Sequence, residues 1–201
     1  RKLSSNKGEM DIEIKYADKI SSINIINGIF QMPEFTANVK VLGSRVDGQD
    51  YWDSELDINT SPIPIQIVKG YIPFNILPDA AYQKLNKLDP KNGQLTIAGL
   101  KYSSKKPDDF LMDMLLKDVV IGFNDLKKTF SNIDGSIRLK KNILSFEKIK
   151  GKYGKSNIEY LNGSIKDFNK EPVIDLKAAS NIDLKDMLDD LKQWQFGRTW
   201  L

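Results

Sequence analysis

The stretch from residue 133 to residue 178 reads Ile133-Asp134-Gly135-Ser136-Ile137-Arg138-Leu139, then Leu144-Ser145-Phe146, Ile158-Glu159-Tyr160, Gly163-Ser164-Ile165 and Ile174-Asp175-Leu176-Lys177-Ala178. Apolar and polar residues alternate in every run, and glycine-, asparagine- or lysine-rich breaks separate the runs. Because successive side chains of a strand point to opposite faces, this pattern predicts antiparallel strands with one apolar and one polar face. Strands of a buried parallel sheet would be apolar on both faces. What covers the apolar face is the functional question.

The first half of the chain continues the alternation less regularly and predicts further strands. Asn27-Gly28 is a typical hairpin turn pair, so the apolar region 23–30 could form one strand or two. Pro62 and Pro64 restrict the apolar run 63–68 to an edge strand or a loop. The remaining strands are expected at 10–16, 35–41, 51–58 and 112–123.

Two segments follow a helical period instead. Pro78 suits the first turn of a helix over 78–88, which Asp89-Pro90 would end. Asp183 suits the N-cap of a second helix over 184–194, whose leucine, methionine and tryptophan side chains share one face. Both are expected to be short amphipathic helices that lie on the sheet or cap it.

The composition limits the chemistry that the chain can perform. Its 201 residues carry 30 basic and 27 acidic side chains, so the formal net charge of +3 indicates no nucleic-acid partner. Cysteine and histidine are absent, which removes thiol nucleophiles, disulfides, Cys/His zinc sites and serine–histidine relays. We therefore expect neither enzyme activity nor a cofactor. No apolar run of about 18 residues is present, so no segment of this sequence reads as a membrane-spanning helix.

A short pattern recurs in the chain: polar, glycine, polar, apolar. It is found at Asn92-Gly93-Gln94-Leu95, Asp134-Gly135-Ser136-Ile137 and Asn162-Gly163-Ser164-Ile165. One interpretation is a turn glycine that opens each strand. The other is a repeating β module that stacks into an elongated array.

Two motifs could indicate chemistry but lack the context for it. The segment 151–156, Gly-Lys-Tyr-Gly-Lys-Ser, ends like a phosphate-binding loop, but Ile149 stands where that motif needs its first glycine. A strand is also expected after it, where the motif needs a helix. The densest acidic group consists of Asp108, Asp109, Asp113 and Asp118. Acidic residues between apolar strand positions usually lie on the polar face, which leaves a glycosidase-like carboxylate pair as the remaining enzymatic alternative.

A strand at 115–123 is followed by the glycine-led run 133–137, the step at 151–156 and the glycine-led run 161–165. The segment 77–93 before them reads as a short helix and a glycine-led strand. This succession, over roughly residues 70–192, resembles the AsmA-like family of bacterial envelope proteins, the TamB/YhdP type.

The resemblance implies a mostly β protein, with an elongated, curved antiparallel sheet that forms an apolar, taco-like groove, as in the bridge-like lipid-transfer proteins of eukaryotes. In that family an N-terminal helix anchors the chain in the inner membrane. The groove crosses the periplasm and carries phospholipid acyl chains toward the outer membrane. We therefore expect a periplasmic segment from a diderm bacterium that supports outer-membrane biogenesis, with its inner-membrane anchor outside this sequence. It would be part of a longer chain, with an N-terminal β segment at 1–70 and an AsmA-like repeat region at 71–201.

Residues of equal parity within each run are expected to line this groove. They are Ile137, Leu139, Leu144, Phe146, Ile158, Tyr160, Ile165, Ile174 and Leu176. Each buried methylene of an acyl chain contributes about 0.8 kcal/mol, so such a lining needs no specific contacts. Alternation alone does not distinguish an open groove from a closed core. The alternative is therefore a β-sandwich binding or adhesion module of the cell envelope, in which a second sheet covers the apolar face.

Overall fold

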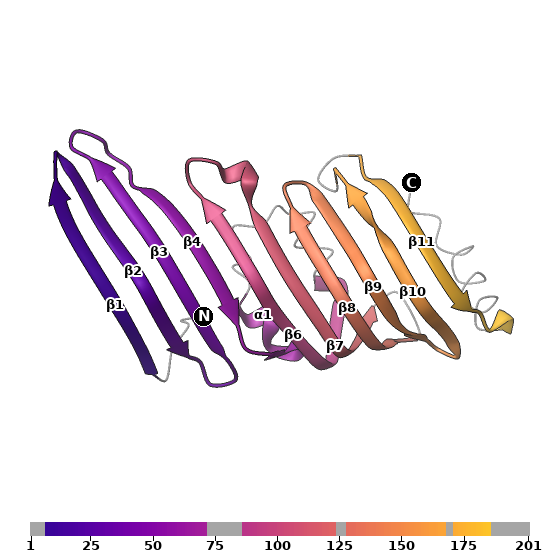
Figure 1. Cartoon of the computed structure of the whole chain (residues 1–201). Coiled ribbons are helices and arrows are strands. Elements are labelled where there is room, and N and C mark those ends of the chain that lie inside the picture. Colours follow the sequence, from indigo (N-terminus) through magenta and orange to yellow (C-terminus); the bar gives the residue numbers. More distant parts are fainter. Residues whose placement is uncertain (1–6, 72–85, 124–127, 168–170, 186–201) are drawn as a thin grey trace.

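The structure, a computed structural model, describes residues 7–71, 86–123, 128–167 and 171–185. Its strands form a single open antiparallel sheet in the order β1-β2-β3-β4-β6-β7-β8-β9-β10-β11, and the short β5 pairs with β6 (Figure 1). The strands are β1 (Lys7–Ala17), β2 (Ile20–Gln31), β3 (Thr36–Val46), β4 (Asp53–Thr60), β5 (Ile63–Pro64), β6 (Leu88–Ser103), β7 (Leu111–Phe123), β8 (Phe130–Lys140), β9 (Ile143–Tyr153), β10 (Ser156–Lys166) and β11 (Val173–Asn181). The other labelled elements are α1 (Ile65–Tyr71) and the 3-10 turn η2 (Pro107–Asp109). The mostly β, antiparallel fold expected from the alternation is confirmed.

The region 23–30 forms part of one continuous strand, so its division into two strands at Asn27-Gly28 is wrong. β2 continues through this pair, and the pairing with β3 shifts register between Ile25 and Gly28. The turn that joins β1 to β2 is instead Asp18-Lys19, with φ angles of 51° and 64°. Two successive left-handed residues are what a tight two-residue hairpin requires.

The apolar run 63–68 is mostly helical, where an edge strand or a loop was expected. Only Ile63 and Pro64 belong to a strand, and α1 begins at Ile65. Side chains of α1 reach the backbone of the neighbouring strand: Gln66 Nε2 donates to the Lys91 carbonyl oxygen at 2.7 Å, and Lys69 Nζ donates to the carbonyl oxygen of Leu88. These tertiary contacts stabilise the helix, although the isoleucines of this run alternate as they would in a strand.

Most of both predicted amphipathic helices lies outside the described residues. Of the segment 78–88, residues 86 and 87 are helical and Leu88 begins β6. Asp89-Pro90, expected to end that helix, lies inside β6. Of the segment 184–194, residues 184 and 185 are described, and both are helical.

The recurring glycines lie inside strands, so their interpretation as turn glycines that open each strand is wrong. Gly93, Gly135 and Gly163 have φ angles of 101°, 139° and 150°, and each stands beside a shift of register. An added Cβ at Gly163 would lie 2.1 Å from the Asp175 carbonyl oxygen. The pattern therefore marks a β-bulge, and it occurs on alternate strands, β6, β8 and β10. The repeating unit of this part of the sheet is a hairpin.

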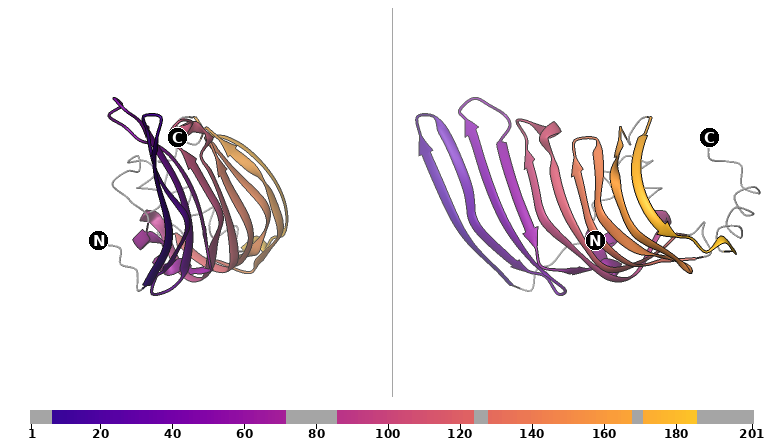
Figure 2. Two further views of the ribbon diagram at one scale, coloured as in Figure 1. Left: turned by 60° about the vertical axis from the view of Figure 1, so that its left-hand side comes forward. Right: turned by 45° about the vertical axis from the view of Figure 1, so that its right-hand side comes forward.

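The sheet is curved, and α1 lies on its concave side (Figure 2). β4 pairs with β6 through four residue pairs, Glu55–Ile58 with Leu100–Ser103. One sheet therefore includes strands from both expected segments, 1–70 and 71–201. The buried hydrophobic residues of the described part are Ile63, Ile65 and Val119. So few buried apolar side chains among the described residues are typical of a single-layer sheet, since a domain with a closed core encloses many more.

Candidate functional site

Strand pairing aligns apolar residues in a row that crosses the whole sheet. Directly paired residues of an antiparallel sheet lie on the same face, so the partners can be followed from strand to strand. The row, called the long row below, consists of Met10, Gly28, Val39, Ile58, Leu100, Met112, Leu139, Leu144, Ile165 and Ile174. It reaches from β1 to β11 without a charged or polar side chain.

Shorter apolar rows flank the long row on the same face. One in the first half consists of Ile12, Ile25, Val41, Leu56 and Tyr102. One in the second half consists of Ile97, Met114, Ile137, Phe146, Gly163 and Leu176. We call the face that carries these rows the apolar face. The opposite, polar face carries charged sets such as Lys40, Asp57 and Lys101, which are paired across β3, β4 and β6.

The helix α1 lies on the apolar face. Phe35, just before β3, shares the parity of Val39 in the long row, and its ring meets that of Tyr71 edge-on at 5.0 Å. Since α1 also lies on the concave side of the sheet (Figure 2), the apolar face is the concave one. Exposure rises toward the two ends of the sheet, reaching 73% at Ile14 on β1 and 61% at Ile174 on β11.

Seven of the nine predicted lining residues fall in the two rows that cross the second half. Leu139, Leu144, Ile165 and Ile174 lie in the long row. Ile137, Phe146 and Leu176 lie in the row beside it.

The other two predicted lining residues lie on either side of a bulge in β10. Ile158 pairs with Gly151 on β9, and three residues later Leu161 pairs with Ile149. Between these two pairs β10 has one residue more than β9. Tyr160 therefore points to the face opposite to the one that simple alternation predicts. Leu161 occupies the apolar-face position that parity assigned to Tyr160, and Tyr160 lies on the polar face.

Sequence reasoning missed the apolar-face residues of β1 to β7. The signal was present in β7, where Met112, Met114 and Leu116 alternate along the strand. Leu115 obscured it, because this apolar residue lies on the polar face, paired with Thr96 and Ser136 and 49% exposed.

The acidic residues that stand close together in the sequence have separate partners in the structure. Asp109 pairs with Lys141 at 3.5 Å, and Asp113 pairs with Arg138 at 2.5 Å. The hydrogen bond and charge of Asp113 raise the pKa of the Arg138 guanidinium above its ordinary value. Asp118 stands at a bulge with a φ angle of 50°, and the side chain of Asp108 lies outside the described part. Within the described ranges, no group of three histidine, cysteine or acidic side chains is placed to hold a metal ion.

The segment that ends like a phosphate-binding loop forms a hairpin. β9 ends at Tyr153 and β10 begins at Ser156, so Gly154, with a φ angle of 57°, and Lys155 form the turn between them. A strand follows the motif, so it lacks the helix N-terminus that would bind a phosphate.

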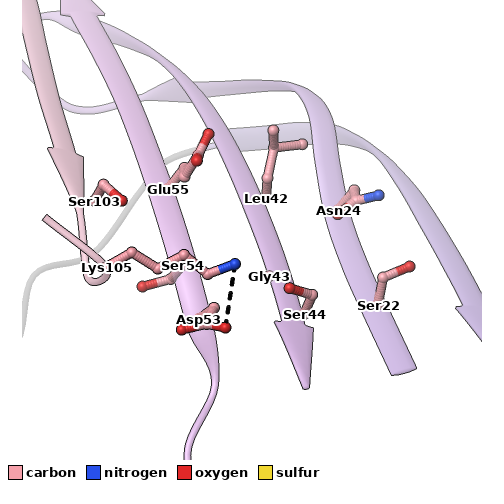
Figure 3. A pocket seen from close by; sticks show the side chains of 10 residues that line it. All are labelled: Ser22, Asn24, Leu42, Gly43, Ser44, Asp53, Ser54, Glu55, Ser103 and Lys105. Carbon is pink, nitrogen blue, oxygen red and sulfur yellow. Dashed lines mark ion pairs between the residues drawn. The ribbon is translucent and has the colours of Figure 1, made fainter. Parts of the chain in front are cut away.

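A pocket of about 170 Å³ lies on the polar face, over β2, β3, β4 and β6 (Figure 3). Its lining is mainly serine hydroxyls, the Asn24 amide and two carboxylates, and an ion pair of 3.3 Å joins Asp53 to Lys105. Such groups are ordinary for the solvated face of an antiparallel sheet. We therefore consider the apolar face, and not this pocket, to be the candidate site.

No helix in the described part of the chain is long and apolar enough to cross a membrane. Comparisons with models of protein families, with curated proteins and with solved structures found no match.

Proposed function

We propose that the concave apolar face is a groove that conducts phospholipid acyl chains, and that the chain is a periplasmic segment of an AsmA-like envelope protein. The observation that carries the proposal is the long row, which is continuous over ten strands and free of charge. An acyl chain on such a surface gains about 0.8 kcal/mol for each methylene removed from water, wherever along the row it lies. Movement along the row exchanges one apolar contact for another.

The dimensions of the row favour a path over a pocket for one molecule. Neighbouring strands lie about 4.8 Å apart, so ten strands extend over about 40 Å. One leaflet of a bilayer has a hydrocarbon depth of about 15 Å, half of its core. The row is thus more than twice as long as the chains of one lipid. A surface of this length suits lipids that follow one another between the inner and outer membranes.

The single sheet favours the groove over the β-sandwich module. All described strands belong to this sheet, so the described residues supply no second sheet to cover the apolar face. Conduction along a groove also needs no reaction, so the proposed role requires neither a catalytic group nor a cofactor.

Native mass spectrometry of the protein purified from bacterial membranes in mild detergent tests the proposal. We expect phospholipid to remain bound, in several copies per chain, and to be lost when the protein is delipidated. A folded monomer that never carries lipid, from membranes or after incubation with phospholipid vesicles, would contradict the proposed function.

A further inference from the structure

Arg45 brings a positive charge to the end of the apolar face. Along β3 it follows Val39, Val41 and Gly43 at alternate positions, so it shares their face. Its direct partner on β2 is Ser21. Among the described residues, Arg45 is the one charged residue at the apolar-face positions of β1 to β4.

In the part of the chain that the structure describes, no acidic side chain forms an ion pair with the Arg45 guanidinium. Arg45 is half-buried, and its guanidinium carbon lies 5.6 Å from the ring centroid of Trp52. Trp52 itself lies over Gly43, where an added Cβ would be 3.6 Å from the indole ring. The nearby Asp47 carboxylate accepts a hydrogen bond of 2.8 Å from the Tyr16 hydroxyl, and no ion pair joins Asp47 to Arg45 in the described part of the chain.

We propose that Arg45 binds the phosphate of a phospholipid headgroup whose acyl chains lie on the apolar face below it. This inference rests on the proposed function and adds a headgroup site to it. A guanidinium presents a planar fork of donors that matches a phosphate. The cation–π contact with the Trp52 ring restrains this fork. Aromatic side chains such as Trp52 and Tyr16 suit a boundary at which an apolar surface meets water.

The distance along β3 fits this arrangement. Arg45 lies six positions after Val39 of the long row, which corresponds to about 20 Å of extended strand. With its headgroup region included, one leaflet is about 20–22 Å deep, half of a bilayer of about 40–45 Å. A lipid held by its phosphate at Arg45 therefore extends its chains past Gly43 and Val41 to the long row.

The test compares two lipids that differ only in the headgroup. Dioleoyl phosphatidylglycerol and dioleoylglycerol, each with the same fluorescent acyl label, are offered in phosphatidylcholine vesicles to the full chain. We expect the wild type to prefer the phosphatidylglycerol by about tenfold, the size of one charge-assisted bidentate contact. Arg45→Gln should abolish this preference and leave dioleoylglycerol binding unchanged, and Arg45→Lys should retain part of it. Lys40→Gln, which removes a charge from the polar face of the same strand, is the matched control and should behave as the wild type.

The outcomes separate the headgroup site from the groove. If the wild type binds both lipids equally, or Arg45→Gln keeps the full preference, the headgroup site is wrong and the groove stands. If millimolar inorganic phosphate displaces phosphatidylglycerol, Arg45 is a site for free anions and the inference fails. If Arg45→Gln and Arg45→Lys lose both lipids equally while their circular dichroism is unchanged, Arg45 has no headgroup role. If the wild type binds neither lipid, the proposed function fails together with the inference.

Discussion

The backbone N–H of Lys148 donates a hydrogen bond of 2.6 Å to the side-chain carbonyl oxygen of Asn162 on the neighbouring strand. The same relationship recurs one hairpin earlier, where the N–H of Asp118 donates to the Asp134 carboxylate at 3.0 Å. Both donors stand at bulges, with φ angles of 53° and 50°, and both acceptors precede a bulge glycine. At these two sites the polar residue before the glycine thus accepts a hydrogen bond from a backbone N–H that the bulge leaves without a partner in the sheet ladder.

Replacement of a bulge glycine should destabilise the sheet. At Gly163 an alanine Cβ would meet the Asp175 carbonyl oxygen, at a φ angle of 150° that side chains rarely adopt. We expect Gly163→Ala to lower the free energy of unfolding by about 2 kcal/mol or more, as measured by urea denaturation. Gly99→Ala is the control, since a Cβ there meets nothing within 4 Å. Equal loss of stability in the two variants would refute the structural role assigned to the bulge.

A charge on the apolar face should reduce lipid binding without unfolding the chain. Ile137 is half-buried on this face, and in an open groove an aspartate there reaches water when lipid is absent. We expect Ile137→Asp and Phe146→Asp to keep the far-ultraviolet circular dichroism of the wild type and to retain several-fold less phospholipid. Leu115→Asp, on the polar face, should retain lipid normally. If Ile137→Asp unfolds the protein while Leu115→Asp does not, the apolar face is a closed core.

Residues 160 and 161 should differ in their protection by lipid. Because the chain contains no cysteine, Tyr160→Cys and Leu161→Cys each introduce a single thiol. Leu161 lies on the apolar face beyond the bulge and Tyr160 on the polar face, so bound phospholipid should slow maleimide labelling only of the Leu161→Cys variant. Protection of the Tyr160→Cys variant instead would mean that the bulge in β10 is misplaced.

Alternation predicted the faces of the second half wherever no extra residue interrupts a strand. Ile137 and Leu139 keep their parity because β8 and β9 pair regularly between Ile137 and Lys140. Tyr160 does not, because a single extra residue in β10 exchanges the two faces. Nothing in a local pattern reveals which strand carries the extra residue, since that depends on its pairing with both neighbours.

The first half was less predictable because apolar residues lie on both of its faces. Leu42 is apolar but pairs with Asn24 and Glu55 on the polar face, where it is 50% exposed. The helix α1 was missed for a different reason. Its contacts are long-range, from Gln66 to Lys91 and from Tyr71 to Phe35, and they are invisible in a local window.

The hydrogen bond between Tyr16 and Asp47 should make stability depend on alkaline pH. This bond to the carboxylate, with its negative charge, raises the pKa of the Tyr16 phenol above its ordinary value. A group whose pKa is raised by folding stabilises the protein below its unfolded pKa, about 10 for tyrosine, and loses this contribution as pH rises through the folded pKa. We therefore expect the wild type to lose more stability than Tyr16→Phe on going from neutral to strongly alkaline pH, in denaturation followed at several pH values. Identical profiles for the two proteins would count against the bond.

Photo-crosslinking to lipid in living cells tests the central claim most directly. A photoreactive amino acid is placed in turn along the long row, at Met10, Ile58, Met112, Leu144 and Ile174. Matched controls place it on the polar face next to each of these positions, at Asp11, Asp57, Asp113, Ser145 and Asp175. The proposed groove predicts that every long-row position captures phospholipid and that the polar-face positions do not. Capture at no position of the long row, or equal capture on both faces, would contradict it.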